Sequence, residues 1–220
     1  MPEPVTLTIV VENTAGREDL RAEHGLSVLV RVGGRRWLFD TGATSEALAH
    51  NAGALGVDLA GLDGVVISHG HTDHAGGMAA VLSAGPVSVY AGSRVFARRW
   101  ASRSGEPMRE IGWRSGPDAL AGRGSRFVAV TGPERLAEGV LVSGPVGGAG
   151  PDNERYTVEA DDGELRLDDF ADEVFLMLDG ADGWVVLSGC CHRGLTNTLR
   201  TARFLAGGRP IAAVVGGLHL

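Results

Sequence analysis

Residues 64–77 have the sequence GVVISHGHTDHAGG, an apolar run followed by four side chains of the types that bind metal ions. The first five residues form a short apolar run bounded by turn signals, which is typical of a strand buried on both faces. His69 and His71 are two apart, so an extended backbone directs both side chains to the same side. Asp73 and His74 begin the next predicted helix. The four side chains therefore converge at the carboxyl end of a buried strand, where open α/β sheets commonly bind ligands.

The chemistry of this cluster indicates a metal site. Imidazoles and a carboxylate suit zinc, then iron or manganese. The alternative is a set of surface histidines in a polar turn. Three histidines and one aspartate within six residues, between a buried strand and a Gly-Gly pair, favour metal binding over that alternative.

The rest of the chain contains strands that come first in hairpins and later alternate with helices. Hydrophobic periodicity predicts strands at 5–11, 26–32, 35–40, 86–90, 173–179, 183–189 and 210–217, and helices at 45–55, 75–83 and 194–206. Gly33-Gly34 is a two-residue hairpin signal, and Ser45 is the expected helix cap. Residues 144–153 are expected to form a loop, and residues 91–125 show no clean period. The mixture predicts an α/β or α+β fold with sheets covered by helices.

Composition bounds the class of protein. The 220 residues suit one domain over 1–220, and 44% hydrophobic with 21% charged residues is an ordinary globular balance. A net charge of −7 argues against a nucleic-acid partner, which requires a basic face. The N-terminal sequence lacks the basic region of a signal peptide, and no apolar stretch approaches the roughly 20 residues of a membrane span. The two cysteines are adjacent, and neighbouring cysteines rarely form a disulfide, so we expect a reduced, cytoplasmic protein. Because the sequence has no candidate membrane span, we expect no membrane partner. The oligomeric state stays open.

The segment SHGHTDHAGG resembles the His-x-His-x-Asp-His motif of the metallo-β-lactamase superfamily. LFDTGAT at 38–44 resembles an earlier aspartate segment of that family, which implies that Asp40 lies behind the metal ligands. LSGCCHRG at 187–194 falls where the family often has a strand ending in Gly-Asp, with Cys190 in place of the bridging aspartate. The resemblance implies a four-layer αββα sandwich with two metals at one edge of the facing sheets.

A narrower resemblance concerns the C-terminal third. The pairing of GCCHRGLTNTL with VVGGLHL at 214–220 resembles the branch of the dihydropterin–ribofuranosylaminobenzene phosphate synthases and related metal-dependent hydrolases. The late strand of that branch delivers a further histidine, here His219.

The resemblance also implies a division of the ligands. His69 and His71 would hold one divalent ion, and Asp73 and His74 the other, with His192 and His219 as the candidates that complete the two sites. Zinc is the first choice of metal, with iron or manganese as alternatives. Cys190 is either a thiolate ligand or a small buried residue, and Cys191 is expected in the core.

The implied activity is hydrolysis of a small anionic substrate by a metal-bound hydroxide, with Asp73 orienting the nucleophile. Arg193 and Asn197 lie near a predicted helix N-terminus, where a phosphate could bind. A pterin-phosphate transferase or synthase, and an inactive metal-binding homologue, stay open as alternatives. A redox enzyme with two irons ranks last.

Three departures from the family pattern motivate the inactive alternative. Relatives have a His-Pro dipeptide where this chain has Ala91-Gly92-Ser93, and they carry a Gly-His-Thr segment that is missing here. Relatives also run on where this sequence stops at Leu220. The second metal position or the substrate pocket could therefore be incomplete or reshaped.

An arginine-rich stretch follows the metal motif. It is either a lid that binds an anionic substrate or a solvated insertion, and the sequence favours the insertion. Its members are Arg94, Arg98, Arg99, Arg103, Arg109 and Arg114, beside Trp100 and Trp113. His24 and His50 have no partners in sequence, so both are expected on the surface.

Overall fold

The structure is a computed structural model that describes residues 4–102, 106–148, 150 and 154–218, and the first half of the chain forms a six-stranded sheet. Its order is β1 (Thr6–Val11), β2 (Ser27–Val32), β3 (Arg35–Phe39), β4 (Gly64–Ile67), β5 (Ser88–Gly92) and β8 (Arg126–Val130). β1 to β3 pair antiparallel, and β3 to β8 pair parallel. Gly33 and Gly34 have φ values of 58° and 73°. Two positive φ values suit a two-residue hairpin turn, so the predicted hairpin is confirmed.

The second sheet comes from the C-terminal half. Its order is β15 (Ile211–Gly216), β14 (Gly183–Ser188), β13 (Leu176–Gly180), β10 (Val140–Val142) and β9 (Glu134–Ala137). All neighbours are antiparallel except β14 and β15, which α5 (Leu195–Leu205) connects. A parallel pair needs such a crossover helix. The predicted hairpin, helix and last strand of this half are confirmed, with boundaries shifted by at most three residues.

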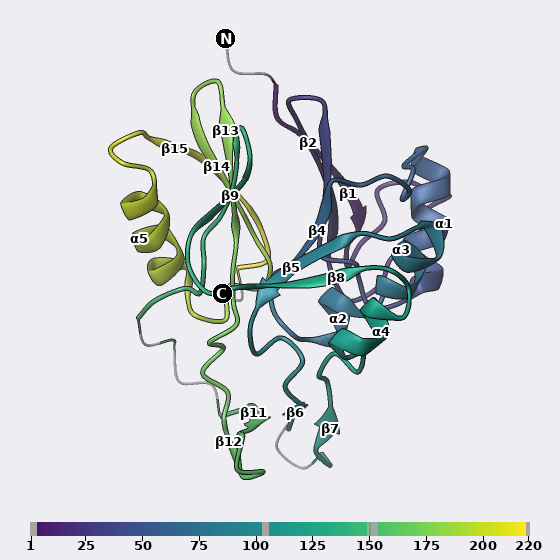
Figure 1. Cartoon of the computed structure of the whole chain (residues 1–220), viewed down its shortest axis with the longest axis vertical. Coiled ribbons are helices and arrows are strands. Elements are labelled where there is room, and N and C mark those ends of the chain that lie inside the picture. The colour runs from purple at the N-terminus through teal and green to yellow at the C-terminus, as the bar shows by residue number, and fades with distance from the viewer. Residues whose placement is uncertain (1–3, 103–105, 149, 151–153, 219–220) are drawn as a thin grey trace.

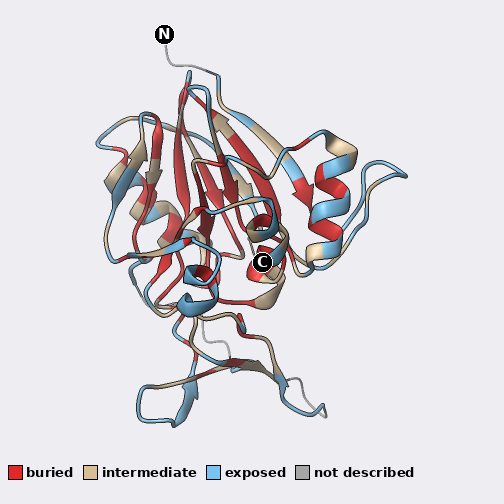
Figure 2. Ribbon diagram, turned by 45° about the vertical axis from the view of Figure 1, so that its right-hand side comes forward, coloured by how far each residue is buried: buried red, intermediate tan, exposed pale blue. Residues whose placement is uncertain are grey.

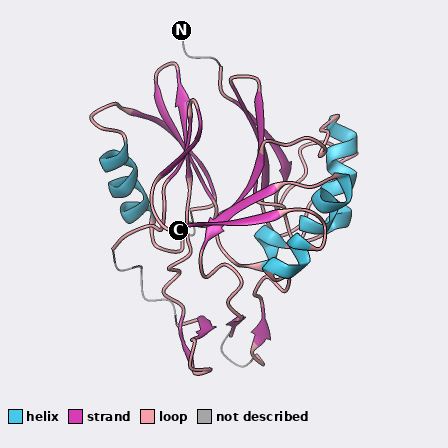
Figure 3. Cartoon of the chain, viewed as in Figure 1, coloured by secondary structure: helices cyan, strands magenta, loops and turns pink. Residues whose placement is uncertain are grey.

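Helices α1 (Ser45–Leu55), α2 (Thr72–Ala75), α3 (Met78–Ala84) and α4 (Pro117–Ala121) lie beside the first sheet, and α5 lies beside the second (Figures 1 and 3). The predicted cap of α1 is wrong by one residue. Thr44, in an extended conformation, accepts the hydrogen bond of the Ala47 backbone N–H, whereas Ser45 is already helical. A cap must have non-helical backbone while its oxygen reaches the N–H three residues on.

The helix predicted at 75–83 is two helices, α2 and α3, interrupted at Gly76 and Gly77. A Cβ atom at Gly76 would lie 2.1 Å from the Ala43 carbonyl oxygen, and one at Gly77 would lie 2.0 Å from that of Thr41. The two glycines therefore let the helical segment pack directly on the backbone that follows β3. The start of α2 brings Asp73 and His74 toward the end of β4, as predicted.

Side chains of the strands alternate between separate cores, because successive residues of a strand point to opposite faces. In β2, Val28 and Val30 pack between the two sheets, and Leu29 packs in the outer core. In β13, Leu176 packs between the sheets and Met177 packs in the core on the α5 side. Two sheets with helices outside each one form a four-layer αββα sandwich.

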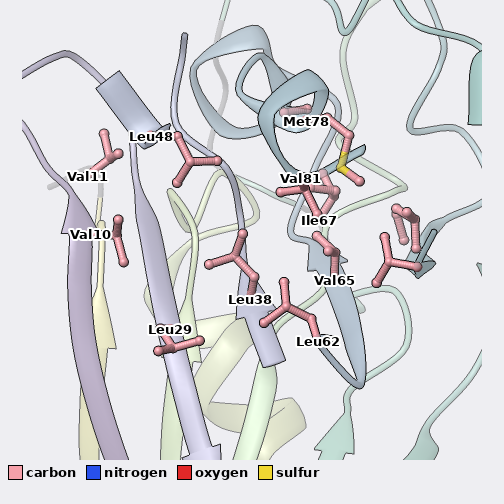
Figure 4. Close-up of a cluster of buried hydrophobic side chains, with 14 of the residues drawn as sticks. Val10, Val11, Leu29, Leu38, Leu48, Leu62, Val65, Ile67, Met78 and Val81 are labelled. Atoms are coloured by element: carbon pink, nitrogen blue, oxygen red, sulfur yellow. The ribbon is translucent and has the colours of Figure 1, made fainter. Parts of the chain in front are cut away.

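Figure 4 shows the outer core of the first sheet, where Leu38 and Ile67 lie among residues of the covering helices. Leu48 comes from α1, and Met78 and Val81 come from α3. β4 is buried along its whole length, as the sequence predicts, because both of its faces are covered.

A third, four-stranded sheet extends below the sandwich in Figure 1. It consists of β12 (Leu165–Leu167), β11 (Tyr156–Glu159), β6 (Arg99–Ala101) and β7 (Arg109–Glu110). Figure 2 shows its far end as mainly exposed or half-buried. The sequence predicted none of these strands, because each is only two to four residues long. In the described ranges, every helix is too short or too polar to cross a lipid bilayer.

Candidate metal centre

The site forms where β4 and β14 end side by side. The Val174 N–H donates to the Ser68 carbonyl oxygen at 2.8 Å, which connects the loop before β13 to the end of β4. A Cβ atom at Gly189, just after β14, would lie 2.2 Å from Ser68 Oγ. Only glycine allows this approach, and it brings the residues after β14 against the histidine motif after β4.

Three histidines form the first potential ligand group. One nitrogen from each of His69, His71 and His192 lies within 4.8 Å of the others. All three residues are buried. His69 Nε2 is buried and has no hydrogen-bond partner in the described part of the chain. Because a buried polar atom without a partner is unfavourable, this nitrogen fits a metal ligand.

Burial lowers the pKa of His69 well below its ordinary value, and the neighbouring His74 and His71 lower it further. His69 is therefore neutral, which is the form of imidazole that binds a metal.

A second potential group shares His69 and adds His74 and Cys190. His74 Nε2 lies 3.0 Å from Cys190 Sγ and 3.4 Å from Asp73 Oδ2. Imidazole, thiol and carboxylate donors thus converge on one side of His74. This set fits zinc, which binds nitrogen, sulfur and oxygen ligands in tetrahedral sites.

Asp40, at the end of β3, holds the two groups together from behind. Its Oδ1 accepts the Ser68 N–H at 2.7 Å, and its Oδ2 accepts the Ser68 hydroxyl at 2.7 Å. Oδ2 also lies 2.6 Å from His74 Nδ1, and Ser68 Oγ lies 2.9 Å from His69 Nδ1. Since a carboxylate only accepts, this network places the proton on Nδ1 of both rings. Nε2 of His69 and of His74 is then directed at the potential metal positions.

The charges of the second group are coupled. Burial alone would lower the pKa of His74, but Cys190, Asp40 and Asp73 together raise it well above its ordinary value. Burial would raise the pKa of Asp73, but His74, His71 and His24 together lower it below its ordinary value. Asp73 is therefore a carboxylate at neutral pH. A proton and a metal ion compete for His74 Nε2, so metal affinity should rise with pH.

Glu173 supports the loop that carries His192. Its two carboxyl oxygens accept the backbone N–H groups of His192 and Arg193, each at 2.7 Å. Burial raises the pKa of Glu173 to about 7, although these two hydrogen bonds oppose the rise. The predicted core position of Cys191 is confirmed, because it is buried with its Sγ 3.0 Å from Ser188 Oγ.

A cavity of about 280 Å³ opens onto Asp73, His74 and Cys190. Its other walls come from the β1–β2 region and from the end of β15, and include Ile9, Glu12, Asn13, His24, Leu26, Val28 and Val215. His24 is exposed, as predicted, and its Nε2 lies 3.4 Å from Asp73 Oδ2. Folding of the loop after β1 makes this contact, so the linear sequence carries no signal for it. His50 is exposed, as predicted.

The predicted phosphate-binding residues are both engaged within the protein. The Arg193 guanidinium donates to the carbonyl oxygens of Asp169 and Gly148, and Asn197 Nδ2 donates to the Arg193 carbonyl oxygen at 2.8 Å. Neither residue is among those that line the cavity. His219 lies outside the described residues, so its place as a ligand stays a prediction.

The prediction of a solvated arginine-rich insertion is wrong for Arg99 and Trp113, which are buried. Arg99 pairs with Asp168 and Asp172, and Trp113 packs on Phe96. The prediction is confirmed for Arg98, which is exposed and pairs with Glu110 and Glu159. Arg103 lies outside the described residues.

Sequence reasoning missed the segment DDFADE at 168–173, whose members contact the site. Its density of acidic residues next to a predicted strand was the available signal.

Backbone geometry marks the same region. Asp40, Phe170 and Cys191 have positive φ values of 55°, 50° and 57°, and they are the non-glycine residues of this kind among those described. Sparsely populated conformations cluster at functional sites.

A family model described as the metallo-β-lactamase superfamily matches residues 20–189. The chain is 26% identical over 214 residues to 7,8-dihydropterin-6-methyl-4-(β-D-ribofuranosyl)-aminobenzene-5′-phosphate synthase from Methanocaldococcus jannaschii, a match covering 90% of this chain and 71% of the relative. It is 29% identical over 220 residues to the protein MJ0448 of the same organism, covering 97% and 79%.

The solved structures include a similar protein, Tm1679, described as a metal-dependent hydrolase of the β-lactamase superfamily. It is 30% identical to this chain and superimposes with a TM-score of 0.79, over 97% of this chain and 76% of the other.

Proposed function

Because the chain belongs to the metallo-β-lactamase superfamily, we propose that it is a metal-dependent hydrolase that acts on a small anionic substrate. The family resemblance and the four-layer αββα sandwich predicted from the sequence are confirmed by the matches and the fold. The hydrolase assignment is supported by Tm1679, whose description names that activity. The single observation that carries the proposal is the convergence of the two ligand groups on His69.

We assign one ion to His69, His71 and His192, and a second to Asp73, His74 and Cys190. This keeps the division that the family resemblance implies and completes it with His192 and Cys190, because Cys190 Sγ lies 3.0 Å from His74 Nε2 and His192 groups with His69 and His71. Zinc is the first choice, because the second group contains sulfur. A cytoplasmic location fits this assignment, since the Cys190 thiol must stay reduced to bind.

When bound, the metals supply Lewis acidity and a hydroxide nucleophile at neutral pH. The chain supplies the rest. Asp73 is ionised and faces the cavity, so its carboxylate can accept a hydrogen bond from the nucleophile and orient it. Asp40 and Ser68 accept from Nδ1 of His74 and of His69, so Nε2 of each ring is the nitrogen that a metal would bind. Among the described residues that line the cavity there is no arginine, so we place the anionic group of the substrate at the metals themselves.

A second candidate is a synthase that joins a pterin to a sugar phosphate. The 26% identical relative from M. jannaschii carries a synthase name, and its match covers 90% of this chain. Formation of the product that the name of this relative specifies, monitored by mass spectrometry, would support this candidate over hydrolysis. Release of product from a panel of activated phosphate esters and lactones would support the hydrolase.

The metal proposal is tested by metal analysis of the purified protein and of His71→Ala. We expect about two equivalents of metal in the wild type, as in two-metal sites, and a clear loss in the variant. His50→Ala is the matched control, because His50 is an exposed histidine that binds a backbone oxygen away from the site. Equal metal content in the wild type and His71→Ala would overturn the proposal.

A further inference from the structure

We propose that Arg99, together with Asp168 and Asp172, is a positioning residue that fixes the spacing of the three-histidine group. The inference rests on the metal centre proposed above. Arg99 lies in β6 of the small sheet, and its side chain is 2% exposed. Its Nε donates to Asp168 Oδ2 and its Nη2 to Asp172 Oδ1, both at 2.7 Å. One buried cation thus holds two buried carboxylates.

The first arm of this network reaches the histidine motif. Asp172 Oδ2 accepts the backbone N–H of Gly70 at 2.8 Å, and Gly70 lies between His69 and His71. A Cβ atom at Gly70 would lie 2.3 Å from Arg99 Nη1. The guanidinium therefore packs directly under the loop, and the loop is held at the residue that sets the relative orientation of the two histidines.

The second arm reaches the other side of the site. Asp168 Oδ1 accepts the N–H of Phe170 at 2.8 Å, which stabilises the positive φ of 50° at that residue. This conformation is unfavourable for an aromatic residue, so it persists only where the surroundings impose it. The Phe170 ring stacks on the His192 ring, with centroids 4.2 Å apart and an angle of 5° between the planes. The same ring contacts His71 edge-on at 5.6 Å.

The two arms contact the two chain segments that supply the three histidines. His69 and His71 follow β4, whereas His192 follows β14, so no local structure fixes the distance between them. Through its carboxylate partners, Arg99 holds the Gly70 backbone of the first segment and Phe170, whose ring stacks on His192 of the second. A buried ion network of this kind is weak evidence for stability alone, because apolar residues of similar volume often stabilise a protein equally well. Because the network binds the Gly70 backbone between His69 and His71, its role is to orient these two potential ligands.

The test is Co²⁺ binding to the metal-free protein, followed by absorption spectroscopy, in the wild type and in Asp172→Asn. The amide cannot accept from both Arg99 and Gly70, because it has only one acceptor oxygen. We expect the dissociation constant of Co²⁺ to rise by on the order of 10–100-fold, as for other residues that orient metal ligands, and the ligand-field bands to change. A merely structural role would lower the melting temperature and leave the spectrum of the folded protein unchanged.

Asp63→Asn is the matched control. Asp63 also accepts from an arginine side chain, Arg35 Nη1 at 2.6 Å, and from a backbone N–H, that of Arg36 at 2.8 Å. It precedes β4, at the opposite end of the strand from the site. We expect this variant to bind Co²⁺ with wild-type affinity and spectrum.

Phe170→Leu keeps the inference testable if Asp172→Asn does not fold. It leaves the ion network in place and removes only the ring stacked on His192. We expect weaker Co²⁺ binding and an altered spectrum in this variant as well. Wild-type affinity and spectrum in the folded variants would overturn the positioning role alone. Absence of Co²⁺ and Zn²⁺ binding to the wild type would overturn the metal centre and the positioning role together.

Discussion

Replacement of Asp40 by asparagine should reverse the preferred neutral tautomer of two metal-facing histidines without changing the shape of the site. In the wild type, Asp40 Oδ2 accepts from the Ser68 hydroxyl, and it lies 2.6 Å from His74 Nδ1. In Asp40→Asn, the amide oxygen can keep the Ser68 N–H, so the amide nitrogen must face the hydroxyl and His74. His74 Nδ1 then accepts instead of donating, so the ring keeps on Nε2 the proton that the wild-type ring must release when a metal binds.

The same reversal passes to His69. Its Nδ1 lies 2.9 Å from Ser68 Oγ, which in the variant accepts from the amide and turns its own proton toward the ring. Nε2 of both rings would carry a proton where a metal must bind. Loss of such an orienting partner typically weakens metal affinity 10–100-fold, or about 1.4–2.7 kcal/mol.

The metal-free protein should also lose stability. Asp40 and His74 are buried, and the raised pKa of His74 keeps it protonated beside Asp40 at neutral pH. Removal of one member of a buried ion pair costs about 3–5 kcal/mol. Total stabilities of domains are about 5–15 kcal/mol, so the variant should still fold but unfold at a clearly lower urea concentration.

The assay is urea unfolding of the metal-free protein at pH 7, with Zn²⁺ affinity measured separately by competition with a chelator. Ser68→Ala is the comparison, because it removes the hydroxyl contact with His69 and leaves the contact between Asp40 and His74. We expect Ser68→Ala to weaken Zn²⁺ binding less than Asp40→Asn. Unchanged Zn²⁺ affinity in folded Asp40→Asn would refute the tautomer argument, whatever the loss of stability.

Three further predictions concern single residues. The pKa of Glu173 is raised to about 7, so the folded metal-free protein retains a proton that the unfolded chain releases above pH 4.5. Stability should therefore decline between about pH 4.5 and 7 by up to roughly 3 kcal/mol. Glu173→Gln should flatten this decline in urea unfolding curves, and an unchanged slope would contradict the assignment. Gly189→Ala places a Cβ atom 2.2 Å from Ser68 Oγ, so we expect a lower melting temperature and reduced metal content together. Thr44→Ala should destabilise the protein by about 1 kcal/mol in chemical unfolding through loss of the helix cap, whereas Ser45→Ala should cost less; the reverse order would favour Ser45 as the cap.

The sequence by itself predicts the layers of the fold and the first metal-binding residues. Both are local features. Alternation of apolar residues assigns strand faces, and the Gly33-Gly34 pair specifies a hairpin. The spacing of His69, His71 and His74 needs only the end of one strand and the start of one helix. Among the strands that the sequence missed, β6, β7, β11 and β12 are only two to four residues long, which is too short for a periodic signal.

Only the tertiary structure decides which residues from other strands face those histidines. Cys190 and His192 are separated from the motif by more than a hundred residues, and their approach depends on Gly189 and on the pairing order of the second sheet. The burial of Arg99 is a clearer case, because an arginine-rich stretch suggests solvent exposure. It is buried because Asp168 and Asp172 meet it inside the protein. Local patterns determine which side chains are available for a site, whereas long-range packing determines their distances and charges.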